Sequence, residues 1–314
     1  LSRRFHIIMG KGGVGKSTVA MTLGLHYTRL GLRTLICEVD DREMMSHAFG
    51  VPPSRSEVRS LTDKLSVVSI DTQAALSEYG ALKLRIKALA SLLTENPLTR
   101  ALISIVPGVA DLIALGKAFN HERERDPEHP HLPRWDRVII DAPSTGHGLT
   151  FLRLPLVIKE VVPSGNMRRE ADDMWSLISD LERTCIHVVS APEDLPLQEA
   201  KELWLALKQD LGVQPQTLWF NHLESAPFDT KDWEEVRRQL SADQSTLWLY
   251  NLLSRRQVLG ERQIEELRVL DSLQGARAYI PHFSVQSLSL LREAIAYALE
   301  AQSDHSSEQE ERSP

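Results

Sequence analysis

Short apolar runs alternate with longer stretches of helical periodicity along most of this chain. Apolar runs bounded by turn residues are typical of buried strands, and they occur at 5–9, 33–40, 65–70, 137–141, 185–190, 216–221 and 277–280. Apolar positions three and four apart predict helices at 19–27, 72–94, 109–120, 149–154, 168–184, 195–211 and 285–301, with two or three more in 231–273 and a short one in 41–50. This alternation predicts an α/β fold, with a doubly wound, mainly parallel sheet flanked by helices.

Proline and polar residues divide this pattern into a folded part and a tail. Pro155 is expected to end the helix that begins near Leu149, because proline has no backbone N–H to donate. We expect one domain over residues 1–301, in which the helix-rich segments 72–120 and 155–184 are candidates for a helical subdomain. Residues 302–314 are polar and acidic, and they predict a disordered tail.

Composition and charge narrow the class of protein. Of the 314 residues, 42% are hydrophobic, which provides enough apolar material for a core, and the net charge of −7 gives no support to nucleic-acid binding. The two cysteines, Cys37 and Cys185, lie in predicted strands and are expected to be buried, reduced thiols. No apolar stretch is long enough to cross a bilayer, and no signal peptide is apparent. We therefore expect a cytoplasmic protein without stable membrane insertion.

A glycine-rich loop stands between the first predicted strand and the first predicted helix. The segment 10–18 reads Gly-Lys-Gly-Gly-Val-Gly-Lys-Ser-Thr, and this order of strand, loop and helix is the context that defines a phosphate-binding loop. Its glycines let backbone N–H groups turn toward an anion, and the helix start adds further N–H groups. Lys16 is expected to reach the outer phosphates of a nucleotide, while the Ser17 hydroxyl binds Mg²⁺.

Acidic residues at the ends of two predicted strands complete this chemistry. Asp141 ends an apolar strand and has the character of an acid that holds Mg²⁺ through water. Glu38, Asp40 and Asp41 end the second strand, where each of them is placed to orient an attacking water. Ligands of doubly wound sheets bind at the carboxyl ends of the strands, which is where all four acids are expected to lie.

Two motifs resemble those of a known family. They are Gly10-Lys11-Gly12-Gly13-Val14-Gly15-Lys16-Ser17 and Asp141-Ala142-Pro143-Ser144-Thr145-Gly146-His147, the second followed by Leu149-Thr150-Phe151-Leu152-Arg153-Leu154-Pro155. Looser matches occur at 107–111, 191–196 and 220–223. The chain resembles the ArsA/Get family of deviant Walker A ATPases, which contains the arsenite-pump ATPases and the ATPases that target tail-anchored membrane proteins.

The resemblance implies roles for individual residues. Lys11 matches the lysine that crosses a dimer interface to the partner's nucleotide, Asn221 matches the residue that recognises adenine, and the backbone at 281–283 is expected to flank the base. Asp40 takes the water-polarising role, but the family commonly has Asp-Pro-Ala-His where this chain has Asp-Asp-Arg-Glu at 40–43, so Glu38 remains an alternative. The expected site comprises Lys11, Lys16 and Asp40 for catalysis, Gly12, Gly13, Val14, Gly15, Lys16, Ser17, Thr18, Asn221, Pro281, His282 and Phe283 for ATP or ADP, and Ser17 and Asp141 for Mg²⁺.

The same resemblance implies a Mg²⁺-dependent ATPase that works as a homodimer, or as a heterodimer with a paralogue. The chain lacks the Cys-x-x-Cys pair and the cysteine cluster that zinc-binding and metalloid-sensing members carry. A hydrophobic protein client is a further expectation, for which Met167, Met174, Trp175, Leu177, Ile178 and the run 156–158 either line a groove or pack on neighbouring helices. The alternatives are a MinD- or ParA-like positioning ATPase, which needs a basic surface or a basic terminal helix, and a metabolic ligase on the same fold.

Overall fold

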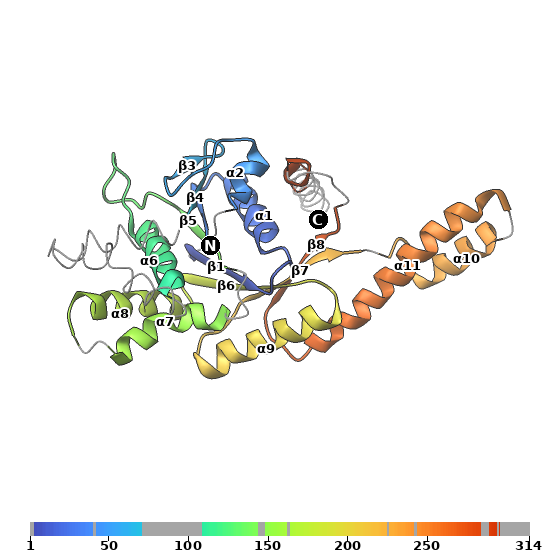
Figure 1. Cartoon of the computed structure of the whole chain (residues 1–314). Coiled ribbons are helices and arrows are strands. Elements are labelled where there is room, and N and C mark those ends of the chain that lie inside the picture. The colour runs from blue at the N-terminus through green and yellow to red at the C-terminus, as the bar shows by residue number, and fades with distance from the viewer. Residues whose placement is uncertain are drawn as a thin grey trace, which may run out of the picture.

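A single eight-stranded sheet organises the molecule (Figure 1). The computed structural model describes residues 3–39, 42–70, 109–143, 148–161, 164–224, 226–241, 244–283, 289–293 and 295. The strands are β1 (Phe5–Gly10), β2 (Thr34–Glu38), β3 (Arg59–Ser60), β4 (Leu65–Ser69), β5 (Arg137–Asp141), β6 (Thr184–Ser190), β7 (Thr217–Leu223) and β8 (Ala276–Pro281). Their order is β3-β4-β2-β5-β1-β6-β7-β8, and β3 alone pairs antiparallel to its neighbour. The expected doubly wound, mainly parallel α/β sheet is confirmed.

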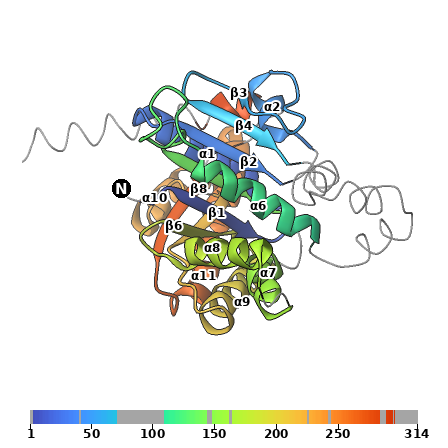
Figure 2. The same cartoon turned by 90° about the vertical axis from the view of Figure 1, so that its left-hand side faces the viewer.

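Helices cover both faces of this sheet (Figures 1 and 2). They are α1 (Lys16–Arg29), α2 (Met44–Phe49), α6 (Val109–Arg123), α7 (Gly148–Val161), α8 (Asn166–Ser179), α9 (Asp194–Asp210), α10 (Thr230–Ser241) and α11 (Leu247–Leu267), with 3-10 turns η1 (Gln244–Thr246) and η2 (Arg268–Leu270). Helices α1 and α2 lie on one face, and α6, α7, α8 and α9 lie on the other. Residues 289–293 and 295 are also helical.

Alternation along the strands sends apolar side chains into two cores. In β1, Phe5, Ile7 and Met9 join the larger core under α6 to α9, whereas Ile8 joins the smaller core under α1 and α2. This two-residue period is what a strand covered on both faces requires. Both cysteines are buried, Cys37 in β2 and Cys185 in β6, as the sequence predicts.

The structure corrects two helix boundaries. Helix α7 runs from Gly148 to Val161 with Pro155 inside it, so this proline does not end the helix. An interior proline costs about 3 kcal/mol, and the burial of Phe151 and Leu152 in the larger core offsets this cost. Helix α8 ends at Ser179, five residues earlier than expected, because Thr184 already pairs with β1.

Several expectations fall outside the described residues. They are the helix at 72–94, most of the candidate subdomain segment 72–120, and the tail 302–314. The described parts of the two candidate segments, α6, α7 and α8, contribute buried side chains to the larger core.

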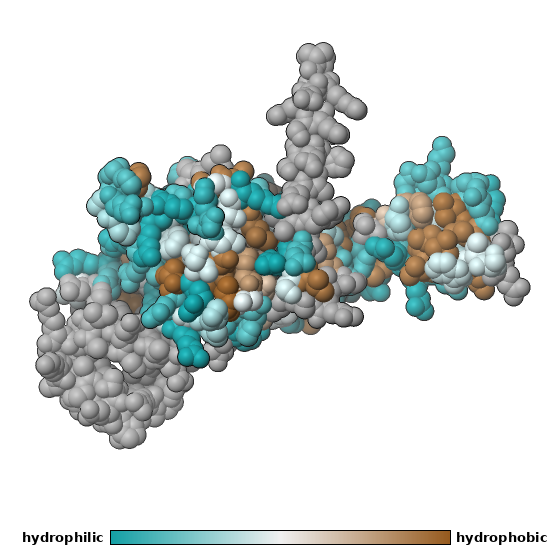
Figure 3. Space-filling view, turned by 90° about the horizontal axis from the view of Figure 1, so that it is seen from above, coloured by the Kyte–Doolittle hydropathy of each residue, from teal (hydrophilic) through white to brown (hydrophobic). Residues whose placement is uncertain are grey.

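A long helical hairpin, α10 and α11, projects from the sheet between β7 and β8 (Figure 1). Trp233 of α10 stacks between Phe228 and Tyr250, with ring centroids 5.9 and 6.4 Å away. Large apolar side chains of α11 remain exposed, and Figure 3 shows brown, hydrophobic surface on the projecting hairpin. The exposed side chains are Leu247, Trp248, Leu252, Val258, Leu259 and Ile264. Among the described helices, none combines the length and the hydropathy that a membrane crossing needs.

Candidate nucleotide site

The glycine-rich loop connects the carboxyl end of β1 to the start of α1. Strand β1 ends at Gly10 and α1 begins at Lys16, with Gly15 as its left-handed N-cap at φ 93°. A Cβ atom at Gly10 would lie 2.4 Å from the carbonyl oxygen of Val189 in β6, so only glycine fits there. The loop is therefore held tightly against the sheet, with the amino terminus of a 14-residue helix opening from it. This is the arrangement in which backbone N–H groups bind an anion.

Lys16 is placed at the first position of α1, where its side chain is 5% exposed. Its Nζ donates to the carbonyl oxygen of Lys11, 2.9 Å away, and so spans the loop. The ammonium group thus lies over the loop rather than in solvent, as the predicted role in phosphate binding requires.

The side chains of Ser17 in α1 and Asp141 at the end of β5 are in contact, although 124 positions separate them in the chain. The Ser17 hydroxyl donates to Oδ2 of Asp141 at 2.5 Å. Asp141 is buried at the end of β5, which pairs directly with β1. A hydroxyl and a carboxylate are the hard oxygen ligands that Mg²⁺ prefers, so these two side chains fit the ion that the sequence assigns to them.

The alternative acid Glu38 lies beside this pair. It is buried at the end of β2, in register with Asp141 of β5, and its Oε1 accepts the backbone N–H of Met45 at 3.0 Å. Asp40 and Asp41 lie outside the described residues, as does the segment 144–147 of the second motif. The assignment of the acid that positions water therefore remains a prediction.

Asn221 lies directly behind the loop. It is 1% exposed, and its Nδ2 donates to the carbonyl oxygen of Val14 at 3.1 Å. An irregularity in the pairing of β7 with β8, with His222 at φ 64°, brings it there. The structure thus gives Asn221 a contact with the loop itself, while its recognition of adenine remains a prediction.

The segment 281–283 leaves the sheet next to the end of β7. The backbone N–H of His282 donates to the carbonyl oxygen of Leu223 at 3.1 Å, and its ring contacts Glu224 at 2.6 Å. Phe283 packs against the smaller core. Pro281, His282 and Phe283 are thus fixed to the same edge of the sheet as Asn221, and their contact with the base stays a prediction.

Lys11 makes a contact that the sequence did not predict. Its Nζ lies 2.7 Å from Oε1 of Glu199 in α9, and the two side chains are 39% and 36% exposed. An ion pair this exposed stabilises a fold by only about 0–1 kcal/mol. No local signal in the sequence distinguishes Glu199 from the other acids of its helix, because the pairing arises from the packing of α9 beneath the loop.

Glu43 is a second residue that sequence reasoning missed. It belongs to the segment where the chain departs from the family pattern, and its carboxylate accepts the backbone N–H groups of Ser54 and Arg55 and the hydroxyl of Ser46. Burial acts to raise the pKa of Glu43, but these hydrogen bonds outweigh it and leave the pKa below its usual value. Glu43 therefore anchors the chain that follows the predicted catalytic acids.

Comparison with known proteins agrees with this geometry. The family model described as anion-transporting ATPase matches residues 3–165. The ATPase BagA of Mycobacterium tuberculosis is 29% identical over 204 residues, which cover 63% of this chain and 59% of that protein. A putative arsenical pump-driving ATPase of Halobacterium salinarum is 25% identical over 256 residues, which cover 76% and 38%. The ATPase GET3 of Kluyveromyces lactis is 28% identical over 170 residues, which cover 51% and 48%.

These relatives are longer than the matched region, since the match spans about three fifths of the first of them and less of the others. The family model itself covers just over half of the present chain and includes the loop, Ser17 and Asp141. With the parallel sheet, the loop at the end of β1 and the acid at the end of β5 all in place, the chain belongs to the anion-transporting ATPase family.

Proposed function

We propose that this protein is a Mg²⁺-dependent ATPase that binds ATP at the loop between β1 and α1 and hydrolyses it to ADP. The hydrogen bond between Ser17 and Asp141 carries the proposal, because it places two oxygen ligands for Mg²⁺ beside the first turn of α1. Lys16 supplies a positive charge at the same place. Phosphoryl transfer relies on such positioning and charge stabilisation rather than on covalent chemistry by the protein.

We also propose that the active form is a dimer with ATP between the subunits, either two copies of this chain or one copy and a paralogue. Lys11 is the residue expected to reach the partner's nucleotide, so it must first leave Glu199 of its own chain. The exposure of that ion pair supports this step, since breaking it costs no more than about 1 kcal/mol. Glu199 thus holds Lys11 when no partner competes for it.

ATP hydrolysis by Lys11 and Glu199 variants tests this proposal. Wild-type protein should release phosphate with Mg²⁺ but not with EDTA, at a specific rate that rises with protein concentration. Lys11→Ala should lower turnover about tenfold or more with little change in ATP affinity, because its charge acts in the closed dimer. Glu199→Gln should keep or exceed wild-type turnover, since it removes only the competing carboxylate. Full activity of Lys11→Ala contradicts the dimer, and hydrolysis that ignores Mg²⁺ contradicts the enzyme.

A hydrophobic protein client is the third part of the proposal, and burial of the α8 side chains favours a binding surface on α11 over the one expected on α8. Met174, Leu177 and Ile178 of α8 are buried in the larger core, so they pack on neighbours rather than line a groove. The exposed apolar side chains lie on α11 instead, where Trp248 is 68% and Val258 61% exposed. A client with an apolar helix would bury this surface along the projecting hairpin.

Binding of a fluorescent, 20-residue apolar helical peptide in detergent tests the role of α11. Trp248→Ser combined with Val258→Ser should weaken binding at least tenfold, because each large apolar side chain contributes about 1.5–3 kcal/mol when buried. Leu195→Ser is the matched control, since Leu195 is 60% exposed but lies on α9. Equal losses in the control and the double variant would place the client elsewhere.

A further inference from the structure

One face of the sheet carries polar side chains where an aliphatic layer is expected. On the side of α1, strands β1, β6 and β7 present His6, Cys185, His187, Thr217 and Trp219, and His6 pairs in register with Cys185 while His187 pairs with Thr217. The opposite face of the same strands is aliphatic and aromatic. Buried polar groups cost free energy unless they have partners, so this cluster calls for an explanation that packing does not provide.

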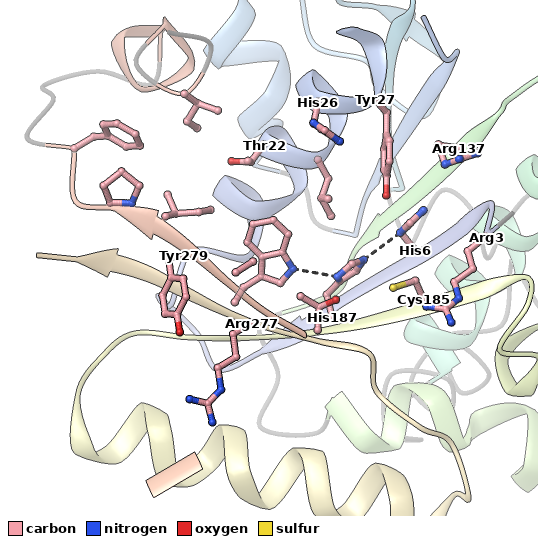
Figure 4. A pocket seen from close by; sticks show the side chains of 18 of the residues that line it. Arg3, His6, Thr22, His26, Tyr27, Arg137, Cys185, His187, Arg277 and Tyr279 are labelled. Carbon is pink, nitrogen blue, oxygen red and sulfur yellow. Dashed lines mark hydrogen bonds between the residues drawn. The ribbon is translucent and has the colours of Figure 1, made fainter. Parts of the chain in front are cut away.

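A cavity of about 820 Å³ lies over this cluster (Figure 4). The middle and second half of α1 form one wall with Thr22, Leu23, His26 and Tyr27, and Ile280 and Pro281 of β8, with Phe283 just after it, close the other end. Pro281 and Phe283 also belong to the segment expected to flank the base of ATP, so the two sites approach each other at this end of the cavity only. Its volume falls in the range of roughly 300–1,000 Å³ typical of small-molecule sites. His6, Arg137 and Thr217 stand near the amino ends of their strands, whereas the phosphate-binding loop is at the carboxyl ends.

The hydrogen bonds in the cavity fix the protons on its histidines. Trp219 Nε1–H donates to Nδ1 of His187 at 3.0 Å. Burial lowers the pKa of His187 to about 3, and burial together with His187 holds the pKa of His6 well below its usual value, so both rings are neutral at pH 7. The proton of His187 therefore sits on Nε2 and is donated to Nδ1 of His6, 3.0 Å away.

The last N–H group in this series of hydrogen bonds, Nε2–H of His6, is buried. With its Nδ1 accepting from His187, His6 carries its own proton on Nε2, which has no hydrogen-bond partner of ordinary geometry in the described part of the chain. The backbone of Arg3 gives this N–H at most a weak hydrogen bond, which acts to raise the pKa of His6, but burial outweighs it and lowers that pKa. A donor that is buried in this way needs an acceptor, and the cavity has room for one.

Two arginines, Arg137 and Arg3, line the same end of the cavity. Arg137 is 6% exposed, and its guanidinium group lies 5.1 Å from the ring centroid of Tyr27. Arg3 lines the same corner beside Cys185 (Figure 4). Glu182 is the one acidic residue among the described lining residues. Arg277 adds little, because it bonds to Asp271 outside the cavity.

The same donor chain argues against a metal ion. His6, Cys185 and His187 bring possible ligand atoms within 4.8 Å of one another. A metal on Nε2 of His187 would require the proton on Nδ1, where it would face the N–H of Trp219 rather than accept from it. An organic acceptor needs no such rearrangement, since it meets the N–H of His6 as the ring stands.

We propose that this cavity binds a small organic anion, with a carboxylate, sulfonate or phosphate group on an aromatic or aliphatic body. The acidic group accepts from His6 Nε2 and from the guanidinium of Arg137, and the body lies between Tyr27 and Trp219. The site is distinct from the phosphate-binding loop. It uses the second half of the same helix, α1, whose first residues form the loop's anion site.

Two fluorescent probes test the proposal: 1-anilinonaphthalene-8-sulfonate, an aromatic anion, and N-phenyl-1-naphthylamine, its neutral counterpart. The anion should bind the wild-type chain saturably at one molecule per chain. Arg137→Gln should weaken it about tenfold to a hundredfold, the range for losing a charged hydrogen bond, while the neutral probe changes less than threefold. Ala278→Phe should abolish the binding of both, because Ala278 pairs with Trp219 and lines the cavity.

Controls separate this site from others that bind such probes. Trp248→Ser removes an exposed tryptophan of α11, on the proposed client surface, and should leave the affinity of both probes unchanged. Saturating MgATP should not displace the anion. If Arg137→Gln unfolds, as circular dichroism would show, Ala278→Phe and the wild-type preference for the anion decide the question. Displacement by MgATP, equal affinity for the two probes, unchanged binding in Ala278→Phe, or stoichiometric zinc binding lost in His6→Leu would each overturn the proposal.

Discussion

Replacement of Lys16 by alanine should abolish ATP hydrolysis by this protein, with a fall in turnover of at least a hundredfold. Lys16 is buried at the start of α1, and its ammonium group reaches back to the carbonyl of Lys11 over the loop. In the proposed enzyme this charge stabilises the phosphates as negative charge develops on them, and removal of one such group typically costs a factor of about 10²–10³ in rate. Steady-state phosphate release under Mg²⁺ measures the effect.

Lys64→Ala provides the matched control for Lys16→Ala. Lys64 also donates its Nζ to a backbone carbonyl, that of Gly31 at 2.9 Å, but it is exposed and lies at the start of β4. Its loss should leave turnover within about twofold of wild type, because it removes the same charge and a similar hydrogen bond far from the loop. Equal losses in the two variants, or more than half of wild-type turnover in Lys16→Ala, would contradict the proposed role.

The sequence predicts most of the sheet because its strands are specified by local patterns. Each long strand is an apolar run that turn residues bound, and these runs appear in the structure with shifts of only a few residues. Pro155 shows where local rules fail, since burial of the neighbouring Phe151 and Leu152 keeps α7 helical through it. The two-residue strand β3 also escapes prediction, because its pairing with β4 depends on the turn between them.

The candidate site divides in the same way. Lys16, Ser17 and Asp141 are predictable because each belongs to a motif at the end of a strand, and the structure brings Ser17 and Asp141 together. Glu199 is not predictable from the sequence, because it reaches Lys11 only through the packing of α9. The sequence does not predict the histidine cluster, because His6 and His187 merely interrupt apolar runs. Only the register of β1 against β6 brings these two positions, 181 residues apart, into contact.

Replacement of Gly15 by alanine should abolish nucleotide binding by the loop, because the added methyl group meets the side chain of Asn221. A Cβ atom at Gly15 would lie 1.9 Å from Nδ2 of Asn221, and the backbone has φ 93°, which disfavours any side chain. The methyl group therefore expels the amide that donates to Val14. We expect loss of measurable ATP binding and a free energy of unfolding lower by about 3 kcal/mol, the sum of backbone strain and a broken buried hydrogen bond.

Gly13→Ala tests the cost of backbone strain alone, without the collision with Asn221 that Gly15→Ala creates. Gly13 has a similar φ of 85°, but no atom lies within 4 Å of the place that a Cβ atom would take there. In nucleotide-free protein it should lower the free energy of unfolding by only about 1–2 kcal/mol, the cost of the left-handed backbone alone. Asn221→Ala should then cost less in the Gly15→Ala background than in wild type, because the contact it removes is already lost. Urea unfolding of wild type and these variants measures the coupling, and equal losses for Gly13→Ala and Gly15→Ala would mean that Asn221 does not hold the loop in place.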